Sequence, residues 1–224
     1  MNWFALLILV LLSYLLGAFP TGVVLGKLFK GVDVRQYGSG KTGATNSLRA
    51  LGWQISLAVF MIDMTKGAAS VLLAQYFFPP EYQPWAVLAS ALACMLGHDY
   101  SIFIGFGGGR GAATGLGELL AVSPLALLFI CLFGVPAVAL TRYVSLASIV
   151  GAALSPVGII VAAYVTGLDW RYVFFSLVCG GLIVIKHSDN IQRLLKGTER
   201  KLGQKTDPVA KNAVSASEKQ SVTK

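Results

Sequence analysis

The chain is organised around the stretch GFGGGRGAAT at residues 105–114, which lies between long apolar segments. Five glycines in the first seven positions let the backbone adopt positive φ and turn successive N–H groups toward one point. Such a nest, with the Arg110 cation inside it and a helix start after it, suits a phosphate group. A flexible turn between two membrane helices is the alternative interpretation, and this one stretch leaves both open.

The apolar segments on either side of this stretch identify a membrane protein. Of the 224 residues, 55% are hydrophobic and only 12% are charged, and the mean hydropathy is +0.70. Soluble chains carry about 25% charged residues, so we exclude a soluble domain and expect an all-α, polytopic integral membrane protein. The three cysteines lie far apart in apolar runs, which indicates neither a disulfide framework nor a metal site. We therefore expect no metal and no cofactor.

The apolar runs predict about seven transmembrane helices, one of them short, at residues 3–25, 53–76, 84–96, 112–122, 124–141, 143–165 and 170–185. The break between the fourth and fifth falls at Ser123-Pro124, because proline interrupts a helix. Residues 112–141 are expected to start and finish on the same side of the membrane as a helical hairpin or re-entrant pair. Pro136 is expected to add a kink.

Basic segments predict the orientation of these helices. Residues 186–224 hold nine Lys/Arg against four Asp/Glu, and residues 27–49 hold five Lys/Arg against one Asp. Basic loops remain in the cytoplasm, which places the N-terminus outside and the C-terminus inside. Residues 1–203 then form a single transmembrane domain, and the Lys/Ser/Thr/Ala-rich residues 204–224 form a disordered basic cytoplasmic tail. The same charges would also suit anionic lipid headgroups.

On this topology four polar clusters share the cytoplasmic face, at residues 38–49, 98–114, 142–148 and 186–200. In the first cluster, Gly40-Lys41-Thr42 resembles the end of a P-loop, but the motif requires glycine where this chain has Arg35. What remains is a set of spaced glycines and a helix start at Thr45-Asn46. Thr45 is either a substrate ligand or simply the helix N-cap.

The third and fourth clusters have helical spacing. Arg142, Ser145 and Ser148 form a polar stripe, unless the arginine only marks the membrane border and the serines bond back to helix carbonyls. His187 and Asn190 lie one turn apart and share a face. His187 is either an ordinary interfacial residue or a group for proton transfer near neutral pH.

Three ionisable residues lie deeper in the predicted spans, namely Asp63, Lys66 and Glu118. Ionisable groups at this depth face the interior of a helix bundle or a cavity. Asp63 and Lys66 are three residues apart on one helix, and we interpret them as a mutually satisfying pair.

Taken together, the clusters resemble the motifs of the bacterial acyl-phosphate glycerol-3-phosphate acyltransferase family. The first motif corresponds to residues 38–49, the second to 97–115, and the third to 142–148 with 187–199. The resemblance spans residues 1 to about 203, and the family's seven-helix fold agrees with the count of apolar runs. Four positions depart from the family pattern, where Lys41 replaces Asn, Gly107 and Arg110 replace Lys, and Ser188 replaces Arg.

The resemblance implies transfer of a fatty acyl group from acyl phosphate to the 1-hydroxyl of glycerol 3-phosphate. The products would be 1-acyl-glycerol 3-phosphate and inorganic phosphate, in phospholipid biosynthesis. It also implies a multi-pass protein of the bacterial inner membrane with its active site facing the cytoplasm. We expect membrane lipid around the chain, no nucleic-acid partner and a monomer.

Roles can be assigned to the polar clusters on this hypothesis. The candidate catalytic residues are Arg110 for charge stabilisation, His187 for the hydroxyl proton and Asn190 for orienting substrate. The remaining candidates bind substrate and are Ser39, Gly40, Lys41, Thr45, Asn46, Arg49, His98, Gly108, Gly109, Thr114, Arg142, Ser145, Arg193 and Glu199. A substrate phosphate could act as the base in place of His187.

Two functions from other classes remain as alternatives. An organophosphate or anion transporter usually shows inverted repeats and a site near the midplane of the membrane. Here no repeat is visible and the polar groups gather at one face. A structural membrane protein with lipid-binding loops would leave the glycine motifs unexplained.

Overall fold

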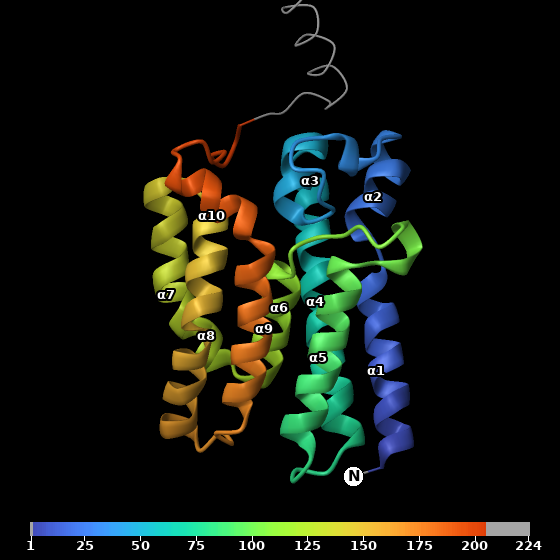
Figure 1. Ribbon diagram of the computed structural model, residues 1–224, viewed down its shortest axis with the longest axis vertical. Helices are drawn as coiled ribbons and strands as arrows, with labels where there is room; N and C mark the ends of the chain where they lie inside the picture. The colour runs from blue at the N-terminus through green and yellow to red at the C-terminus, as the bar shows by residue number, and fades with distance from the viewer. Residues whose placement is uncertain (1, 205–224) are drawn as a thin grey trace, which may run out of the picture.

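The computed structural model describes residues 2–204, which are predominantly α-helical and contain no β-strand beyond one isolated bridge (Figure 1). Two short 3-10 turns, η1 (Val34–Gln36) and η2 (Ile102–Ile104), interrupt the loops. The helices are, in chain order, α1 (Trp3–Ala18), α2 (Thr21–Lys30), α3 (Ala44–Leu51), α4 (Trp53–Phe77), α5 (Gln83–Asp99), α6 (Ala112–Val122), α7 (Pro124–Thr141), α8 (Val144–Thr166), α9 (Tyr172–Lys186) and α10 (Ser188–Leu195). The predicted tail, residues 204–224, lies outside the described residues except for its first position.

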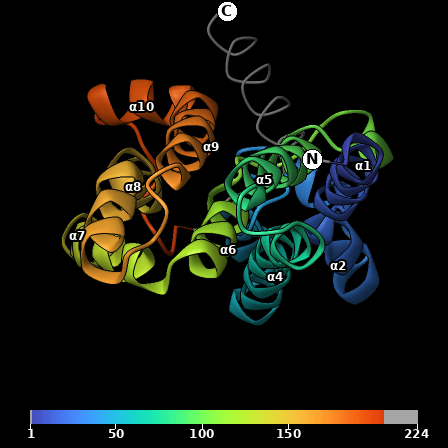
Figure 2. The ribbon, with the colours of Figure 1, turned by 90° about the horizontal axis from the view of Figure 1, so that it is seen from below.

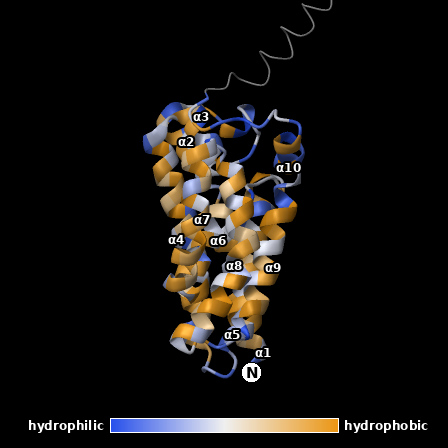
Figure 3. Ribbon diagram, turned by 90° about the vertical axis from the view of Figure 1, so that its left-hand side faces the viewer, coloured by the Kyte–Doolittle hydropathy of each residue, from blue (hydrophilic) through white to orange (hydrophobic). Residues whose placement is uncertain are grey.

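The helices form two groups with α6 between them (Figures 1 and 2). One group contains α1, α2, α4 and α5, and the other contains α7, α8 and α9. The short helices α3 and α10 lie at the same end of the bundle, and the N-terminus lies at the opposite end. Hydrophilic residues gather at the end that holds α3 and α10, around α2 and the loops there. The rest of the bundle is mainly hydrophobic (Figure 3).

All seven apolar segments predicted from the sequence are helical, and the all-α membrane class is confirmed. Four segments are long and apolar enough to cross a membrane, namely Trp3–Lys30, Trp53–Phe77, Pro124–Thr141 and Val144–Thr166. A fifth is added if α9 and α10, which meet at a bend of 57°, count as one broken span. The number of spans and the orientation in the membrane stay predictions.

The first helix is not continuous, so the prediction of one helix over residues 3–25 is wrong. It breaks at Phe19-Pro20, because proline has no N–H and clashes with the preceding turn. The chain resumes as α2 at Thr21, and this helix is capped by Gly31, whose φ of 65° is one that glycine adopts most easily. The break leaves carbonyl groups of α1 without helical partners.

The predicted hairpin break at Ser123-Pro124 is confirmed. The Ser123 hydroxyl accepts a hydrogen bond from the Ala126 N–H at 3.2 Å, and Pro124 occupies the first turn of α7. Both features favour a helix start at this point. Pro136 lies inside α7 without ending it.

Small residues let the helices within each group approach closely. Gly17 of α1 lies against the Cys94 carbonyl of α5, and Gly117 of α6 lies against the Met64 carbonyl of α4. A Cβ at either glycine would overlap the facing backbone. Close packing of this kind is typical of helices in membranes.

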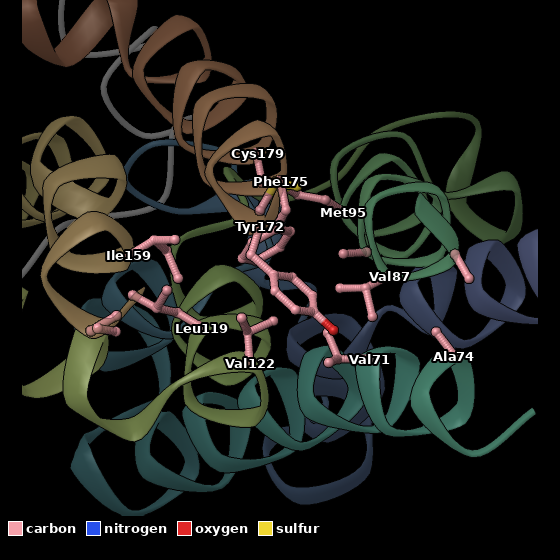
Figure 4. Packing of buried hydrophobic residues seen from close by; sticks show 14 of the residues in the cluster. Val71, Ala74, Val87, Met95, Leu119, Val122, Ile159, Tyr172, Phe175 and Cys179 are labelled. Atoms are coloured by element: carbon pink, nitrogen blue, oxygen red, sulfur yellow. The ribbon is translucent and has the colours of Figure 1, made fainter. Parts of the chain in front are cut away.

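The two groups meet in a shared apolar core. Side chains from α4, α5, α6, α8 and α9 converge there, and Tyr172, Phe175 and Cys179 of α9 face Met95 and Val87 of α5 (Figure 4). Met95, Phe175 and Cys179 of this core also line the cavity described below.

Candidate active site

A cavity of about 610 Å³ lies between the two helix groups and is reached by all four predicted polar clusters. Most of the predicted site residues line it, namely Ser39, Lys41, Thr45, Asn46, Arg49, His98, Gly109, Arg110, Ser145, His187, Asn190 and Glu199. The structure therefore brings together residues as distant in sequence as 39 and 199, as the predicted convergence on one face requires.

The other five predicted residues do not line the cavity, and they are Gly40, Gly108, Thr114, Arg142 and Arg193. Arg142 is the clearest difference, since it ends α7 with a φ of 63°. Its guanidinium donates to the Leu202 carbonyl at 2.9 Å. Its side chain therefore holds the segment after α10, and the structure does not bring it to the cavity as predicted.

Asn46 organises the loop before α3. Its amide nitrogen donates to the carbonyls of Val34, Tyr37 and Lys41 at 3.0, 3.0 and 2.9 Å, and its oxygen accepts from the Ser39 N–H at 3.0 Å. The residue is buried, with 2% of its surface exposed. Although Asn46 reaches the cavity wall, its hydrogen bonds give it a structural role in shaping this loop.

Helix α3 begins at Ala44, one residue before the predicted start. Gly43 is its N-cap, and no side chain caps the helix. The interpretation of Thr45 as an N-cap is therefore wrong, and Thr45 is instead the second residue of α3 and lines the cavity.

The glycine-rich stretch forms a tight loop across the middle of the bundle (Figure 1). Gly105, Phe106 and Gly111 have positive φ, as expected for a chain that turns sharply. The N–H groups of Phe106 and Gly109 donate to the carbonyls of Ser101 and His98 at 2.8 and 3.0 Å. These two amides are used within the loop, so the stretch is a narrower nest than the sequence predicts.

Arg110 carries the charge of this loop into the cavity. Its side chain is 15% exposed, and its Nη2 lies 3.6 Å from the carboxylate of Asp189 on α10. The Nε atom is enclosed and has no hydrogen-bond partner within residues 2–204. Burial lowers the pKa of the Arg110 guanidinium, and the nearby Arg193 cation adds to this effect. A guanidinium nevertheless stays charged, so Arg110 holds an unused donor for an anion.

Two more cations line the same end of the cavity. Burial lowers the pKa of Lys41, with repulsion from Lys186 and Arg110 as the next causes. Burial also lowers the pKa of Arg49, whose guanidinium donates to the Arg200 carbonyl at 3.3 Å. Buried cations that repel one another are stabilised when an anionic ligand binds between them.

Glu199 is the centre of the opposite wall. Its Oε1 accepts from Ser145 at 3.0 Å and from the Asn190 amide at 2.8 Å, and its Oε2 accepts from Arg193 Nε at 2.7 Å. Burial acts to raise the pKa of Glu199, but these three hydrogen bonds outweigh it and the net pKa is lowered. Glu199 is therefore an ionised carboxylate that holds three side chains in place.

The two serines of α8 differ in role: one contacts another site residue, and the other bonds back to its own helix. Ser145 contacts Glu199, whereas Ser148 donates to the Val144 carbonyl of its own helix at 3.1 Å. Both serines line the cavity, but only Ser145 donates to another cavity residue.

His187 lies at the junction of α9 and α10 and is 5% exposed. Its Nδ1 lies 2.8 Å from the Ile183 carbonyl. A carbonyl only accepts hydrogen bonds, so Nδ1 carries the proton and the neutral ring has a bare Nε2. His187 lines the cavity and is suited to accept a proton there.

The predicted Asp63–Lys66 pair is present deep in the bundle, with Nζ 2.9 Å from Oδ1. It is part of a larger network that the sequence did not reveal. Thr21 donates to Asp63 at 2.8 Å, and Lys66 lies 2.9 Å from Nδ1 of His98. The available signal was Pro20, because a helix broken by proline leaves carbonyls that need a donor.

The cavity continues from its charged end into the apolar helices. Met95, Phe175 and Cys179 line this apolar part, and so does Val135 of α7, which is 63% exposed. The cavity is therefore not closed off at α7. Glu118 also lines this part, and neither of its carboxyl oxygens has a partner within residues 2–204.

Residues 2–204 contain no group of three or more His, Cys, Asp or Glu side chains placed to hold a metal ion. The polar lining combines the cations Lys41, Arg49 and Arg110 with three carboxyl groups and two histidines. Such a set can bind phosphate groups and can move a proton.

Comparison with known proteins agrees with this geometry. The family model described as glycerol-3-phosphate acyltransferase matches residues 7–197. A glycerol-3-phosphate acyltransferase of Rippkaea orientalis is 39% identical over 92% of this chain and 96% of its own length. Glycerol-3-phosphate acyltransferase 2 of Moorella thermoacetica is 42% identical over 89% of this chain and 99% of its own length.

Solved structures show the same fold. The crystal structure of PlsY, an integral membrane glycerol 3-phosphate acyltransferase, in its glycerol 3-phosphate form is 42% identical to this chain. The match covers 88% of this chain and 96% of that one, with a TM-score of 0.80. The lysophosphatidic acid form of PlsY matches with a TM-score of 0.78 and 41% identity. This chain belongs to the glycerol-3-phosphate acyltransferase family.

Proposed function

We propose that this protein transfers a fatty acyl group from an acyl phosphate to the 1-hydroxyl of glycerol 3-phosphate. The hydroxyl oxygen attacks the acyl carbonyl carbon, the new ester C–O bond forms, and the bond to the phosphate oxygen breaks. The products are 1-acyl-glycerol 3-phosphate and inorganic phosphate. The hydroxyl proton passes to a base in the cavity.

The observation that carries this proposal is a single cavity with a cationic end and an apolar end. Both substrates carry phosphate, which suits Arg110, Lys41 and Arg49. The donor also carries a long apolar chain, which suits the wall made by Phe175, Val135 and their neighbours. Val135, on the apolar helix α7, lines the cavity and is exposed, which supports entry of the acyl chain from lipid at this helix.

Two groups are placed to assist the transfer. His187 presents a bare Nε2 that can accept the hydroxyl proton. The Asn190 Oδ1 is buried, has no hydrogen-bond partner among residues 2–204, and can orient the hydroxyl. Arg110 stabilises the charge that develops on the departing phosphate. A phosphate is a good leaving group, so the attack is direct and needs no acyl-enzyme.

A donor assay tests the reaction. Purified protein should release phosphate from palmitoyl phosphate only when glycerol 3-phosphate is present, and palmitoyl-CoA or palmitoyl-acyl-carrier protein of equal chain length should give little product. The headgroup end of the cavity is lined by small residues and isolated cations, which offer no broad surface for coenzyme A. Comparable turnover with palmitoyl-CoA would contradict the choice of donor but not the acyl transfer.

The protein is proposed to act as a monomer in the bacterial inner membrane, with the charged end of the cavity facing the cytoplasm. The basic residues around α2, α3 and α10 support this orientation. Single cysteines in a cysteine-free background at Pro80 and Lys196 test it in intact cells. A membrane-impermeant thiol reagent should label position 80 only, and labelling of position 196 from outside would reverse the orientation.

A further inference from the structure

The buried ammonium of Lys66 is surrounded by four acceptor atoms from three separate parts of the chain. Its Nζ lies 2.8 Å from the Gly17 carbonyl, 3.3 Å from the Phe19 carbonyl, 2.9 Å from Asp63 Oδ1 and 2.9 Å from His98 Nδ1. An ammonium has three protons and no lone pair, so it can only donate. The contact with His98 therefore requires that Nδ1 is bare.

A neutral imidazole with a bare Nδ1 carries its proton on Nε2. The ring of His98 is neutral because a second positive charge next to the Lys66 ammonium is unfavourable. Within residues 2–204, Nε2 makes no hydrogen bond to protein. It is also not fully enclosed, so a ligand can reach it. The ring lies against Gly109, where a Cβ would overlap it, and both residues line the cavity.

We propose that Lys66 is a positioning residue that holds His98 in its Nε2–H tautomer, so that His98 donates a hydrogen bond to an anionic substrate oxygen beside Arg110. The role of this hydrogen bond rests on the proposed function. The tautomer itself follows from the contacts of Lys66 and does not depend on that function.

The network has the composition that this role requires. Asp63 neutralises the ammonium, and Thr21 donates to the same Asp63 oxygen at 2.8 Å. The helix break at Pro20 turns the Gly17 and Phe19 carbonyls toward Lys66, and the Phe19 carbonyl also accepts from the Thr21 N–H at 3.0 Å. The two carbonyls and Asp63 accept from Lys66, and Thr21 fixes the Asp63 carboxylate, so the ammonium is held in one place against Nδ1.

The other histidine has the opposite arrangement. Nδ1 of His187 contacts a carbonyl and is protonated, which leaves its Nε2 bare. Each ring thus presents Nε2 to one cavity, His98 as a donor and His187 as an acceptor. A donor suits a phosphate oxygen and an acceptor suits a hydroxyl.

The tautomer can be measured directly by ¹⁵N NMR of histidine-labelled protein in nanodiscs. The chain has only two histidines, so a His187→Asn variant assigns the His98 signals. His98 should show a protonated Nε2 and a bare Nδ1. Lys66→Arg, which keeps a donor-only cation, should preserve this pattern, and Lys66→Met should lose it. A protonated Nδ1 in the wild type, or an unchanged pattern in Lys66→Met, would overturn the proposal.

Kinetics test whether the tautomer matters for substrate. Lys66→Met and His98→Leu should each raise KM for one of the phosphate substrates about tenfold, as expected for loss of a hydrogen bond to a charged group. The double variant should be no worse than either single variant, because both remove the same interaction. His98→Gln, which retains a donor, should recover part of the loss, and Lys27→Met on the exposed face of α2 should match wild type. Additive losses in the double variant would overturn the proposal.

Folding and activity can be separated in these tests. Where Lys66→Met does not yield a monodisperse protein with a cooperative thermal transition, the wild-type ¹⁵N pattern decides alone. A wild-type protein with protonated Nε2 and no transfer from palmitoyl phosphate would contradict the proposed function and support the tautomer.

Discussion

The two walls of the cavity are built in different ways. The glycine wall, made of residues 38–49 and 98–111, is held mainly by backbone hydrogen bonds and by the Asn46 amide. The carboxylate wall, made of residues 142–148 and 187–199, is held by side chains that donate to Glu199. The first wall should therefore be sensitive to the size and shape of its residues, and the second to a single charge.

The largest expected effect comes from Asn46, whose side chain holds the loop of the glycine wall. Asn46→Leu removes four hydrogen bonds and leaves buried carbonyls unpaired, at about 1–3 kcal/mol for each unsatisfied group. We expect kcat/KM to fall at least about a hundredfold and the thermal midpoint to drop. The loop is then free to leave the cavity.

A matched control is Asn2→Leu, which removes an exposed cap at the start of α1. Such a cap contributes about 1 kcal/mol, and activity should be unchanged. If Asn46→Leu kept more than half of wild-type activity, the glycine wall would not depend on this side chain.

The next effect tests the carboxylate wall by charge alone. Glu199→Gln keeps the shape but turns an acceptor toward Ser145, Asn190 or Arg193 into a donor. We expect kcat/KM to fall about ten- to a hundredfold, because the new amide N–H faces a buried side chain that is itself a donor. Glu81→Gln, an exposed acid at the opposite end of the bundle, should have no effect. Equal activity of the two variants would remove the distinction between the walls.

Arg110, on the glycine wall, pairs with Asp189 on the carboxylate wall. Substitutions at this position test whether the positive charge or the shape of the side chain matters more. Arg110→Ala should lower kcat/KM at least about tenfold, because a hydrogen bond to a charged group contributes about 1.5–3 kcal/mol. Arg110→Lys should retain much more activity, because it keeps the cation. Arg171→Ala, whose guanidinium pairs with Asp169 at the far end, is the control. Unchanged kinetics in Arg110→Ala would reduce the glycine-rich stretch to a connecting loop.

The smallest effect is a pH dependence of the glycine wall. Burial lowers the pKa of Lys41, so its ammonium loses a proton at a lower pH than that of an exposed lysine. As the pH rises through this lowered pKa, the neutral amine binds phosphate less well and KM should increase a few-fold. Lys41→Arg should shift the rise to higher pH, because a guanidinium stays charged. An identical alkaline profile in both proteins would show that Lys41 does not titrate in the working range.

Much of this architecture follows from local pattern. Apolar runs of membrane length predicted the helices, and Ser123-Pro124 predicted the break between α6 and α7 because capping and proline sterics act within a few residues. The convergence of the polar clusters also followed, since alternate ends of successive spans must lie on the same side. Most of the predicted site residues line one cavity for this reason.

The tertiary structure alone decided what each polar residue does. Arg142 and Ser148 have the residue types of a site, but their donors are satisfied by a terminal segment and by a helix carbonyl. Lys66 lies on a different helix from the groups that it holds, and Asn46 bonds to irregular loop residues, so helical spacing in the sequence could not reveal either set of partners. The choice of tautomer at His98 and His187 depends on one contacting atom in each case. Sequence periodicity determined which faces are buried, whereas hydrogen bonds between distant segments determined which buried groups remain free to bind substrate.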